Sequence, residues 1–140
     1  MSEIKIHDAT TEDIQCIGKG INRHNDSQAP FSQVPEFVSF NKCIKDGDKV
    51  VAGILSEMYL WNILTVDILW VDEEYRNKGY ATILLKYVEK QGKEMGCTLS
   101  HLDTFDFQAR GLYEKLGYRV FGILEDCPEG HERYYMSKKL

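Results

Sequence analysis

The chain has 140 residues, of which 43% are hydrophobic and 28% are charged, and its formal net charge is −5. This length fits a single domain over residues 1–140 with its own core, and the negative charge argues against a general nucleic-acid binder. No apolar run approaches the ~20 residues that cross a membrane, and the first residues lack a secretory signal, so we expect a cytoplasmic protein.

The N-terminal quarter predicts a strand, a helix and a loop. Residues 4–7 alternate between apolar and polar side chains, as a short strand does. Thr10 stands three residues ahead of Asp13 and predicts a capped helix start. The apolar positions of this helix, which we expect to end near residue 25, are Ile14, Ile17 and Ile21. Residues 25–35 are rich in polar residues and proline and predict a loop, followed by a helical turn over residues 36–40.

The middle of the chain predicts two hairpins. Residues 40–44 and 50–59 have strand composition and are joined across Asp46-Gly47, a strong hairpin dipeptide. A turn at residues 60–62 leads into a further strand that ends at Val71. Its alternation places the even positions on the core side, namely Leu64, Val66, Ile68 and Trp70. The opposite face carries Asp67, a charge in an otherwise apolar strand.

The second half predicts two helices and three strands. A loop over residues 76–81 leads into a helix that ends at Gly96. Its apolar spacing predicts an inward face made of Ile83, Leu84, Tyr87, Val88 and Met95. A strand over 97–102, a short helix over 108–116 and a hairpin of strands 118–124 and 132–138 follow. The predicted order β-α-β-β-β-α-β-α-β-β describes an α/β protein with a mixed sheet flanked by helices.

The connection between the strand that ends at Val71 and the following helix is a candidate anion site. The first turn of a helix has unpaired N–H groups and partial positive charge, so an anion can bind there. Gly79 lets a ligand approach the backbone, and residues 76–94 carry five cations against two anions, +3 locally and −8 elsewhere. We therefore expect a polyphosphate. The dinucleotide and nucleotide-hydrolase glycine patterns are both missing from the sequence.

Two segments resemble the GNAT family of N-acetyltransferases. The run Arg76-Asn77-Lys78-Gly79-Tyr80-Ala81 is similar to its acyl-CoA pyrophosphate loop, and residues 108–118, QARGLYEKLGY, are similar to its C-terminal helix segment. Residues 102–109 further resemble a bacterial branch whose acceptor is unassigned. The resemblance covers essentially the whole chain. It implies the GNAT fold, with a mostly antiparallel sheet, and an N-acetyltransferase that uses acetyl-CoA as co-substrate.

The resemblance also implies roles for individual residues. Tyr113 takes the place of the acid that protonates the departing thiolate. Main-chain groups of the strand end would bind the pantetheine arm, and the N–H of Val71 would polarise the thioester carbonyl. The predicted cofactor-binding residues are Leu69, Trp70, Val71, Arg76, Asn77, Lys78, Gly79, Tyr80, Ala81, Thr82 and Phe107.

A base must take a proton from the acceptor amine, which is mostly protonated at neutral pH. Asp67 is the candidate because it shares a strand face with Leu69 and Val71, although a structural carboxylate is an equally good interpretation. Asp106 departs from the asparagine that the family often has at this position, which puts a cofactor contact there in doubt.

The sequence gives less support to a covalent acyl-enzyme or a metal site than to direct acetyl transfer. An acyl-enzyme on Cys97 would need His101 close by, but four strand residues separate them by roughly 13 Å. The four histidines are scattered without metal-ligand spacing, and the four cysteines form no C-x-x-C pair. We therefore predict no metal and interpret each histidine as a surface or structural residue.

The acceptor is predicted to be an amine of a small molecule or a peptide. Glu57 and Asp67 near the cleft favour a cationic amine, and the loop over residues 25–40 would help to shape its pocket. We expect no nucleic-acid or membrane partner, while the C-terminal hairpin leaves a homodimer open. Two other functions stay open: a non-catalytic acyl-CoA sensor or interaction module of the same fold, and a nucleotide-binding module.

Overall fold

The computed structural model describes residues 3–140 and divides into two compact units, Met1–Phe31 and Ser32–Leu140. In the first unit, α1 (Thr11–Gln28) begins with the predicted capping box, in which the Asp13 N–H donates to Thr10 Oγ1 at 3.2 Å and the Thr10 N–H to the Asp13 carboxylate at 2.9 Å. The predicted strand over residues 4–7 is wrong: residues 3–10 have no regular secondary structure. Residues 3–31 of this unit include no strand with which residues 4–7 could pair.

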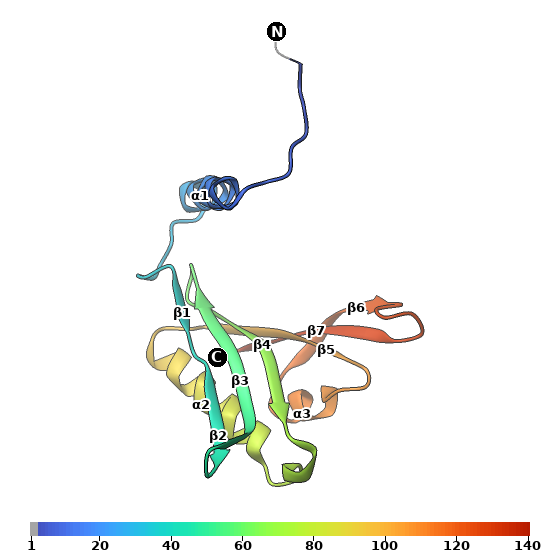
Figure 1. The fold of residues 1–140 in the computed structure, drawn as a ribbon. Helices are drawn as coiled ribbons and strands as arrows, with labels where there is room; N and C mark the ends of the chain where they lie inside the picture. Colours follow the sequence, from blue (N-terminus) through green and yellow to red (C-terminus); the bar gives the residue numbers. More distant parts are fainter. Residues whose placement is uncertain (1–2) are drawn as a thin grey trace. The chain divides into compact units, whose positions relative to one another are not determined.

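The second unit is built on one sheet. Among the described residues seven strands form it, in the order β1-β3-β4-β5-β7-β6 with β2 also paired to β3 (Figure 1). The strands are β1 (Phe37–Ser39), β2 (Lys42–Asp46), β3 (Lys49–Tyr59), β4 (Ile63–Val71), β5 (Leu99–Phe105), β6 (Arg119–Glu125) and β7 (Glu132–Lys139). The helical segments are the 3-10 turn η1 (Glu73–Tyr75), α2 (Tyr80–Glu94) and α3 (Arg110–Lys115). Each recorded strand pair is antiparallel except β4 with β5, which confirms the predicted mostly antiparallel α/β fold.

The first hairpin differs from its prediction. Residues 36–40 are not a helical turn, because β1 pairs with β3 at Phe37↔Tyr59 and the Phe40 N–H donates to the Ser56 carbonyl at 2.8 Å. Five residues are too few for periodicity to separate a turn from a short edge strand. The Asp46-Gly47 connection between β2 and β3 is confirmed, with Gly47 at a φ of +60°.

A β-bulge in β4 reverses the predicted faces of half the strand. Ser56 of β3 pairs with Val66 while Leu55 pairs with Ile68, so Asp67 is the extra residue. After the bulge, Ile68 and Trp70 are 53% and 45% exposed, whereas Leu69 and Val71 pack against the core. The predicted core positions Leu64 and Val66 are correct, but Ile68 and Trp70 are wrong because one inserted residue turns every later side chain to the other face.

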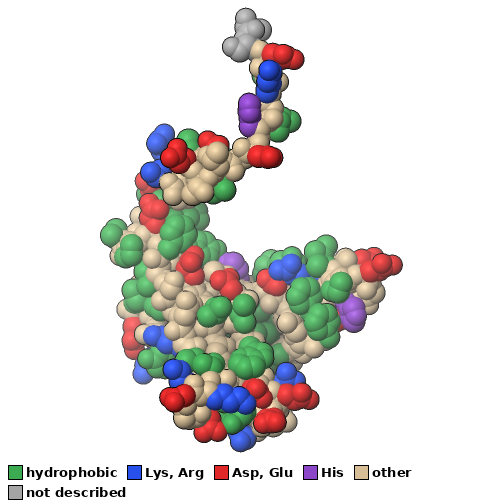
Figure 2. Space-filling view, in the orientation of Figure 1, with side chains coloured by type: hydrophobic (Ala, Val, Ile, Leu, Met, Phe, Trp, Pro, Cys, Tyr) green, Lys and Arg blue, Asp and Glu red, His purple; other side chains and the backbone are tan. Residues whose placement is uncertain are grey.

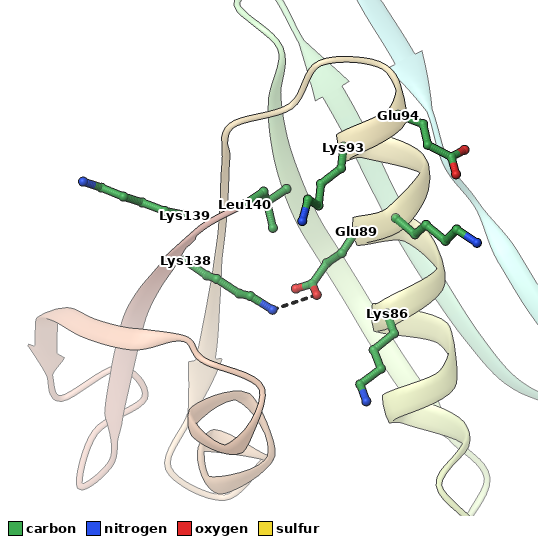
Figure 3. Close-up of a pocket in the computed structure, with 8 residues that line it drawn as sticks. Lys86, Glu89, Lys93, Glu94, Lys138, Lys139 and Leu140 are labelled. Carbon is green, nitrogen blue, oxygen red and sulfur yellow. Dashed lines mark hydrogen bonds and ion pairs between the residues drawn. The ribbon is translucent and has the colours of Figure 1, made fainter.

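The buried face of α2 is rotated from the predicted one. Leu84 and Val88 are buried as predicted, but Ile83, Tyr87 and Met95 are about half exposed. The remaining buried positions are Leu85, Glu89 and Gly92. Glu89 can be buried because its carboxylate accepts from Lys138 Nζ at 2.9 Å and from the Tyr118 hydroxyl at 2.8 Å. Figure 3 shows this pair linking α2 to the end of β7. Spacing of apolar residues alone could not find a buried carboxylate.

Both helices of the second unit pack on the same face of the sheet. The Tyr118 hydroxyl that bonds Glu89 also lies 2.7 Å from Ser100 Oγ of β5, and the Tyr118 ring meets Tyr113 of α3 edge to face at 5.9 Å. The core therefore lies between this sheet face and the two helices. The opposite face carries the side chains of His101 and its cross-strand neighbours.

Candidate active site

The central parallel strands separate partway along their length. β4 and β5 pair only from Ile63↔Leu99 to Val66↔Leu102. Immediately after this paired stretch, the bulge at Asp67 changes the course of β4. A cavity of about 620 Å³ opens between the strand ends, and it is lined by the end of β4, the loop before α2, the end of β5 and α3. The strand end that was predicted to bind the pantetheine arm, residues 69–71, lines this cavity.

Nearly all predicted site residues line this one cavity. They include Tyr113, Asp67 and each predicted cofactor-binding residue except Lys78, whose ammonium lies 5.1 Å from the centre of the Tyr75 ring. The cavity also has lining residues that were not predicted to belong to a site, which are Val66, Ile68, Tyr75, Asp103, Thr104, Gln108, Ala109 and Leu112. Three of these, Gln108, Ala109 and Leu112, belong to the C-terminal segment that resembles the GNAT family. That segment could have indicated them.

The start of α2 has the features of an anion site. Gly79 has a φ of +80°, in the left-handed region that favours glycine, and it directly precedes the helix. Within residues 3–140 no side chain caps this helix, and its first turn holds no acidic residue. The main-chain N–H groups of the first turn are therefore available, and no carboxylate within that turn offsets the helix dipole. Charged side chains crowd the surface at the lower end of β4, where this loop lies (Figure 2).

Side chains hold the loop before α2 in place. Arg76 Nε donates to the carbonyl oxygen of Val71 at 3.3 Å, which joins the loop to the strand end. The Tyr75 hydroxyl donates to the Asp46 carboxylate at 2.6 Å, and this bond is the main reason that the pKa of Tyr75 is raised to about 12. The loop is thus tied both to β4 and to the β2–β3 hairpin.

Tyr113 of α3, whose side chain carries a hydroxyl, lines the cavity. The residue is 6% exposed, and burial, with a smaller effect from the Asp103 charge, raises its pKa to about 12. Within the described part of the chain no hydrogen bond to this hydroxyl is formed. The phenol therefore stays protonated at neutral pH and is free to bond a ligand in the cavity.

The two aspartates of the cavity differ in their surroundings. Asp103 on β5 forms an ion pair with Arg133 at 2.8 Å. Asp67 is exposed at the bulge of β4, and among residues 3–140 no ion pair or hydrogen bond engages its carboxylate. Of these two carboxylates, Asp67 is the one available to an incoming cation.

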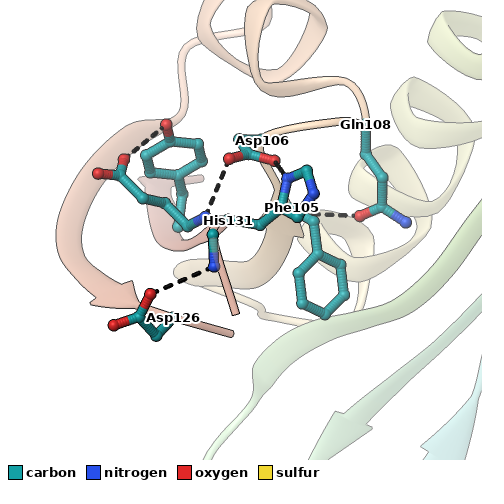
Figure 4. Close-up of polar contacts among 8 residues, drawn as sticks. Phe105, Asp106, Gln108, Asp126 and His131 are labelled. Atoms are coloured by element: carbon teal, nitrogen blue, oxygen red, sulfur yellow. Dashed lines mark hydrogen bonds and ion pairs between the residues drawn. The ribbon is translucent and has the colours of Figure 1, made fainter. Parts of the chain in front are cut away.

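The Asp106 carboxylate bonds other residues of the chain. Its carboxylate accepts from the Glu132 N–H at 2.9 Å and lies 2.8 Å from His131 Nδ1 (Figure 4). These contacts, the main-chain one first, hold the pKa of Asp106 below its usual value. The neighbouring Phe107 ring stacks on Phe105, with ring centres 5.2 Å apart. Asp106 therefore braces the end of β5 against β7.

The sequence profile of the Acetyltransferase (GNAT) family matches residues 10–118. The chain belongs to this family. It is 37% identical over 91 residues to the blasticidin-S acetyltransferase of Streptomyces morookaense, a match that spans 64% of this chain and 67% of that protein. A crystal structure of an acetyltransferase from Bacillus cereus ATCC 14579 has 34% identity and a TM-score of 0.87, covering 98% of both chains. The fold also matches a Bacillus anthracis acetyltransferase solved with acetyl coenzyme A, at 18% identity and a TM-score of 0.64 over 73% of this chain and 62% of that one.

Family membership establishes the activity of the chain. This GNAT protein is an acetyl-CoA-dependent acetyltransferase, as the resemblance in its sequence implied. The described helices include none long and apolar enough to span a membrane. Residues 3–140 contain no group of three metal-ligating side chains.

Proposed function

We propose that this protein transfers the acetyl group of acetyl-CoA to a primary amine of a small cationic acceptor, by direct attack within a ternary complex. The observation that carries the proposal is that one cavity is lined by the uncapped start of α2, the separated end of β4 and Tyr113. The acid would protonate the leaving thiolate, and the phosphate site and the exposed strand end would bind acetyl-CoA.

Different ends of the cavity would bind different parts of acetyl-CoA. The loop from Arg76 to Thr82 would hold the pyrophosphate through the free N–H groups of α2, with Arg76 and Lys78 supplying positive charge. The end of β4 would align the pantetheine arm along residues 69–71, and the Val71 N–H would polarise the thioester carbonyl. Phe107 lines the same cavity from the β5 side.

The unpaired carboxylate of Asp67 favours the proposal that the acceptor is cationic. A carboxylate without a partner attracts an ammonium group and can take up its proton, directly or through water. The relatives support a small molecule, since one is named a blasticidin-S acetyltransferase and a fold neighbour is an aminoglycoside 6′-N-acetyltransferase complexed with coenzyme A. Tyr113 would then give its proton to the thiolate as the carbon–sulfur bond breaks.

Binding and turnover can be tested separately. Acetyl-CoA should raise the melting temperature in a saturable way, by an amount equivalent to about 2.7 kcal/mol at 100 times Kd. Arg76→Glu should abolish most of this shift, whereas Lys86→Glu, an equal charge change on α2 outside the cavity, should retain it. If Arg76→Glu binds acetyl-CoA like the wild type, the assigned phosphate site is wrong.

Turnover is measured by release of the coenzyme A thiol with a panel of cationic small amines, neutral amines and peptides. The proposal expects thiol release that depends on a cationic small amine. Saturable binding without thiol release for any amine would instead support a non-catalytic sensor. Transfer to peptides alone would contradict the small-molecule acceptor.

A further inference from the structure

A row of side chains crosses the sheet beside the cavity. Glu57 of β3 pairs with Thr65 of β4, and Thr65 pairs with His101 of β5. Directly paired residues lie on one face of a sheet. This face is opposite the one covered by α2, because Leu64 and Leu102, the neighbours of Thr65 and His101 along their strands, are buried in the core.

His101 lies next to the point where the strands separate. It is two residues before Asp103, which lines the cavity, and its partner Thr65 is two residues before Asp67. At ~3.3 Å per residue, the imidazole is within roughly one side-chain length of the place where an acceptor bound by Asp67 would lie. An acceptor approaching from this face would meet His101.

Tyr59 fixes the orientation of His101. The Tyr59 hydroxyl lies 2.7 Å from His101 Nε2, and the two rings meet edge to face with centres 5.9 Å apart. Burial raises the pKa of Tyr59, so the phenol is neutral at ordinary pH. With Nε2 engaged by Tyr59, His101 Nδ1 is the ring nitrogen left for a ligand or water, and among residues 3–140 no bond to Nδ1 is formed.

We propose that His101 accepts the proton that the acceptor ammonium loses before attack, and that Tyr59 is its positioning residue. This inference rests on the proposed function, and it gives His101 the proton-accepting role for which Asp67 was the candidate. An imidazole ordinarily titrates near pH 6.5 and a carboxylate near pH 4, so the imidazole is better matched to general base catalysis at neutral pH. Asp67 then binds the ammonium, and His101 receives its proton.

The protons balance over one turnover. One ammonium proton passes to His101 Nδ1, directly or through one water, while Nε2–H donates to the Tyr59 oxygen. The neutral nitrogen forms a bond to the thioester carbon, and the carbon–sulfur bond breaks as the Tyr113 proton passes to sulfur. The surplus proton on the new amide nitrogen returns to Tyr113, and His101 releases its proton to solvent. An ammonium and a thioester thus give an amide, a thiol and one proton.

Several charged or titratable groups lie on this face or beside it. Glu57 and Tyr59 lie on β3, Asp67 on β4, and Asp103 on the same strand as His101. The groups on β7 are Arg133, Tyr135 and Lys139, from the pairs Phe105↔Arg133, Asp103↔Tyr135 and Leu99↔Lys139. Arg119 lies on β6, from the pair Arg119↔Ser137. The test compares variants with the wild type.

The pH dependence of kcat tests the proposal. The wild type should show a limb in which kcat rises with pH as His101 loses its proton. His101→Ala should lower kcat roughly 100-fold with little change in the KM for acetyl-CoA, should lose that limb, and should recover activity when free imidazole is added. His24→Gln, on exposed α1, is the matched control and should keep the wild-type profile.

Tyr59→Phe separates positioning from a merely structural role. The variant loses the hydrogen bond between Tyr59 and the imidazole, which in the protonated state stabilises the charged ring. The limb should therefore move to lower pH by about 0.5 to 1 unit, while kcat above the limb changes less than about 3-fold. A wild-type profile in His101→Ala, or failure of both imidazole rescue and the Tyr59→Phe shift, overturns the proposal. Absence of thiol release by the wild type with every amine would instead refute the proposed function from which it starts.

Discussion

Replacing Tyr113 by Phe removes one hydroxyl from the cavity and leaves the buried ring in place. That hydroxyl makes no hydrogen bond within the described residues, so the free energy of unfolding should change by less than about 0.5 kcal/mol. The co-substrate affinity should also stay within about 3-fold, because the proposed pyrophosphate and pantetheine contacts lie elsewhere. The loss should appear in kcat.

The size of that loss follows from the proton transfer. A free thiol titrates near pH 8.5, whereas the pKa of Tyr113 is raised to about 12. Complete transfer from phenol to thiolate is therefore uphill by about 3.5 units, or roughly 5 kcal/mol. Tyr113 must donate while the carbon–sulfur bond breaks and recover a proton from the new amide nitrogen. A poorly matched acid lies at the low end of the 10²–10⁴-fold range of general acid catalysis, so kcat should fall about 100-fold.

The assay combines thiol release at saturating acetyl-CoA with thermal unfolding of the same samples. A second readout comes from alkaline pH. Because the pKa of Tyr113 is raised by folding, the wild type loses stability as the pH rises from the unfolded value near 10 to the folded value of about 12, and Tyr113→Phe should lack this part of the loss. Wild-type kcat in the variant would refute the acid assignment. A large drop in melting temperature at neutral pH would show that the hydroxyl has a structural role.

Three further substitutions test the packing around the site. Glu89→Ala should lower the free energy of unfolding by about 2–4 kcal/mol in urea titrations, because the Lys138 ammonium, whose side chain is 26% exposed, loses its buried partner. Asp106→Asn should destabilise the protein near pH 7, and its difference from the wild type should shrink as the pH falls below about 4. A carboxyl whose pKa is lowered by folding stabilises the fold above its ordinary pKa and loses that effect as the pH falls through the folded value. Gly92→Ala should not raise the free energy of unfolding, although alanine favours a helix over glycine by about 1 kcal/mol. The new Cβ would lie 3.2 Å from Cys97 Sγ, and this close contact should cancel the gain. A stabilised variant would contradict this packing.

Local signals indicated the candidate binding loop and the candidate acid. Gly79 requires a left-handed backbone, the helix start follows at once, and Tyr113 lies in a short helix with its own motif. Each of these depends on residues close in sequence. The strand over residues 4–7 and the helical turn over 36–40 were wrong because alternation over four or five residues does not reveal whether a partner strand is present.

The sequence by itself determined the family, the strand-loop-helix unit that would hold acetyl-CoA, and the candidates Asp67 and Tyr113. Only the tertiary structure decided the bulge at Asp67, which depends on pairing with β3, and the burial of Glu89, whose partner Lys138 is 49 residues away. The pairing of His101 with Tyr59 across 42 residues is of the same kind. Backbone conformation and helix starts are set by neighbouring residues, whereas strand register and buried polar partners are set by segments that meet only when the sheet forms.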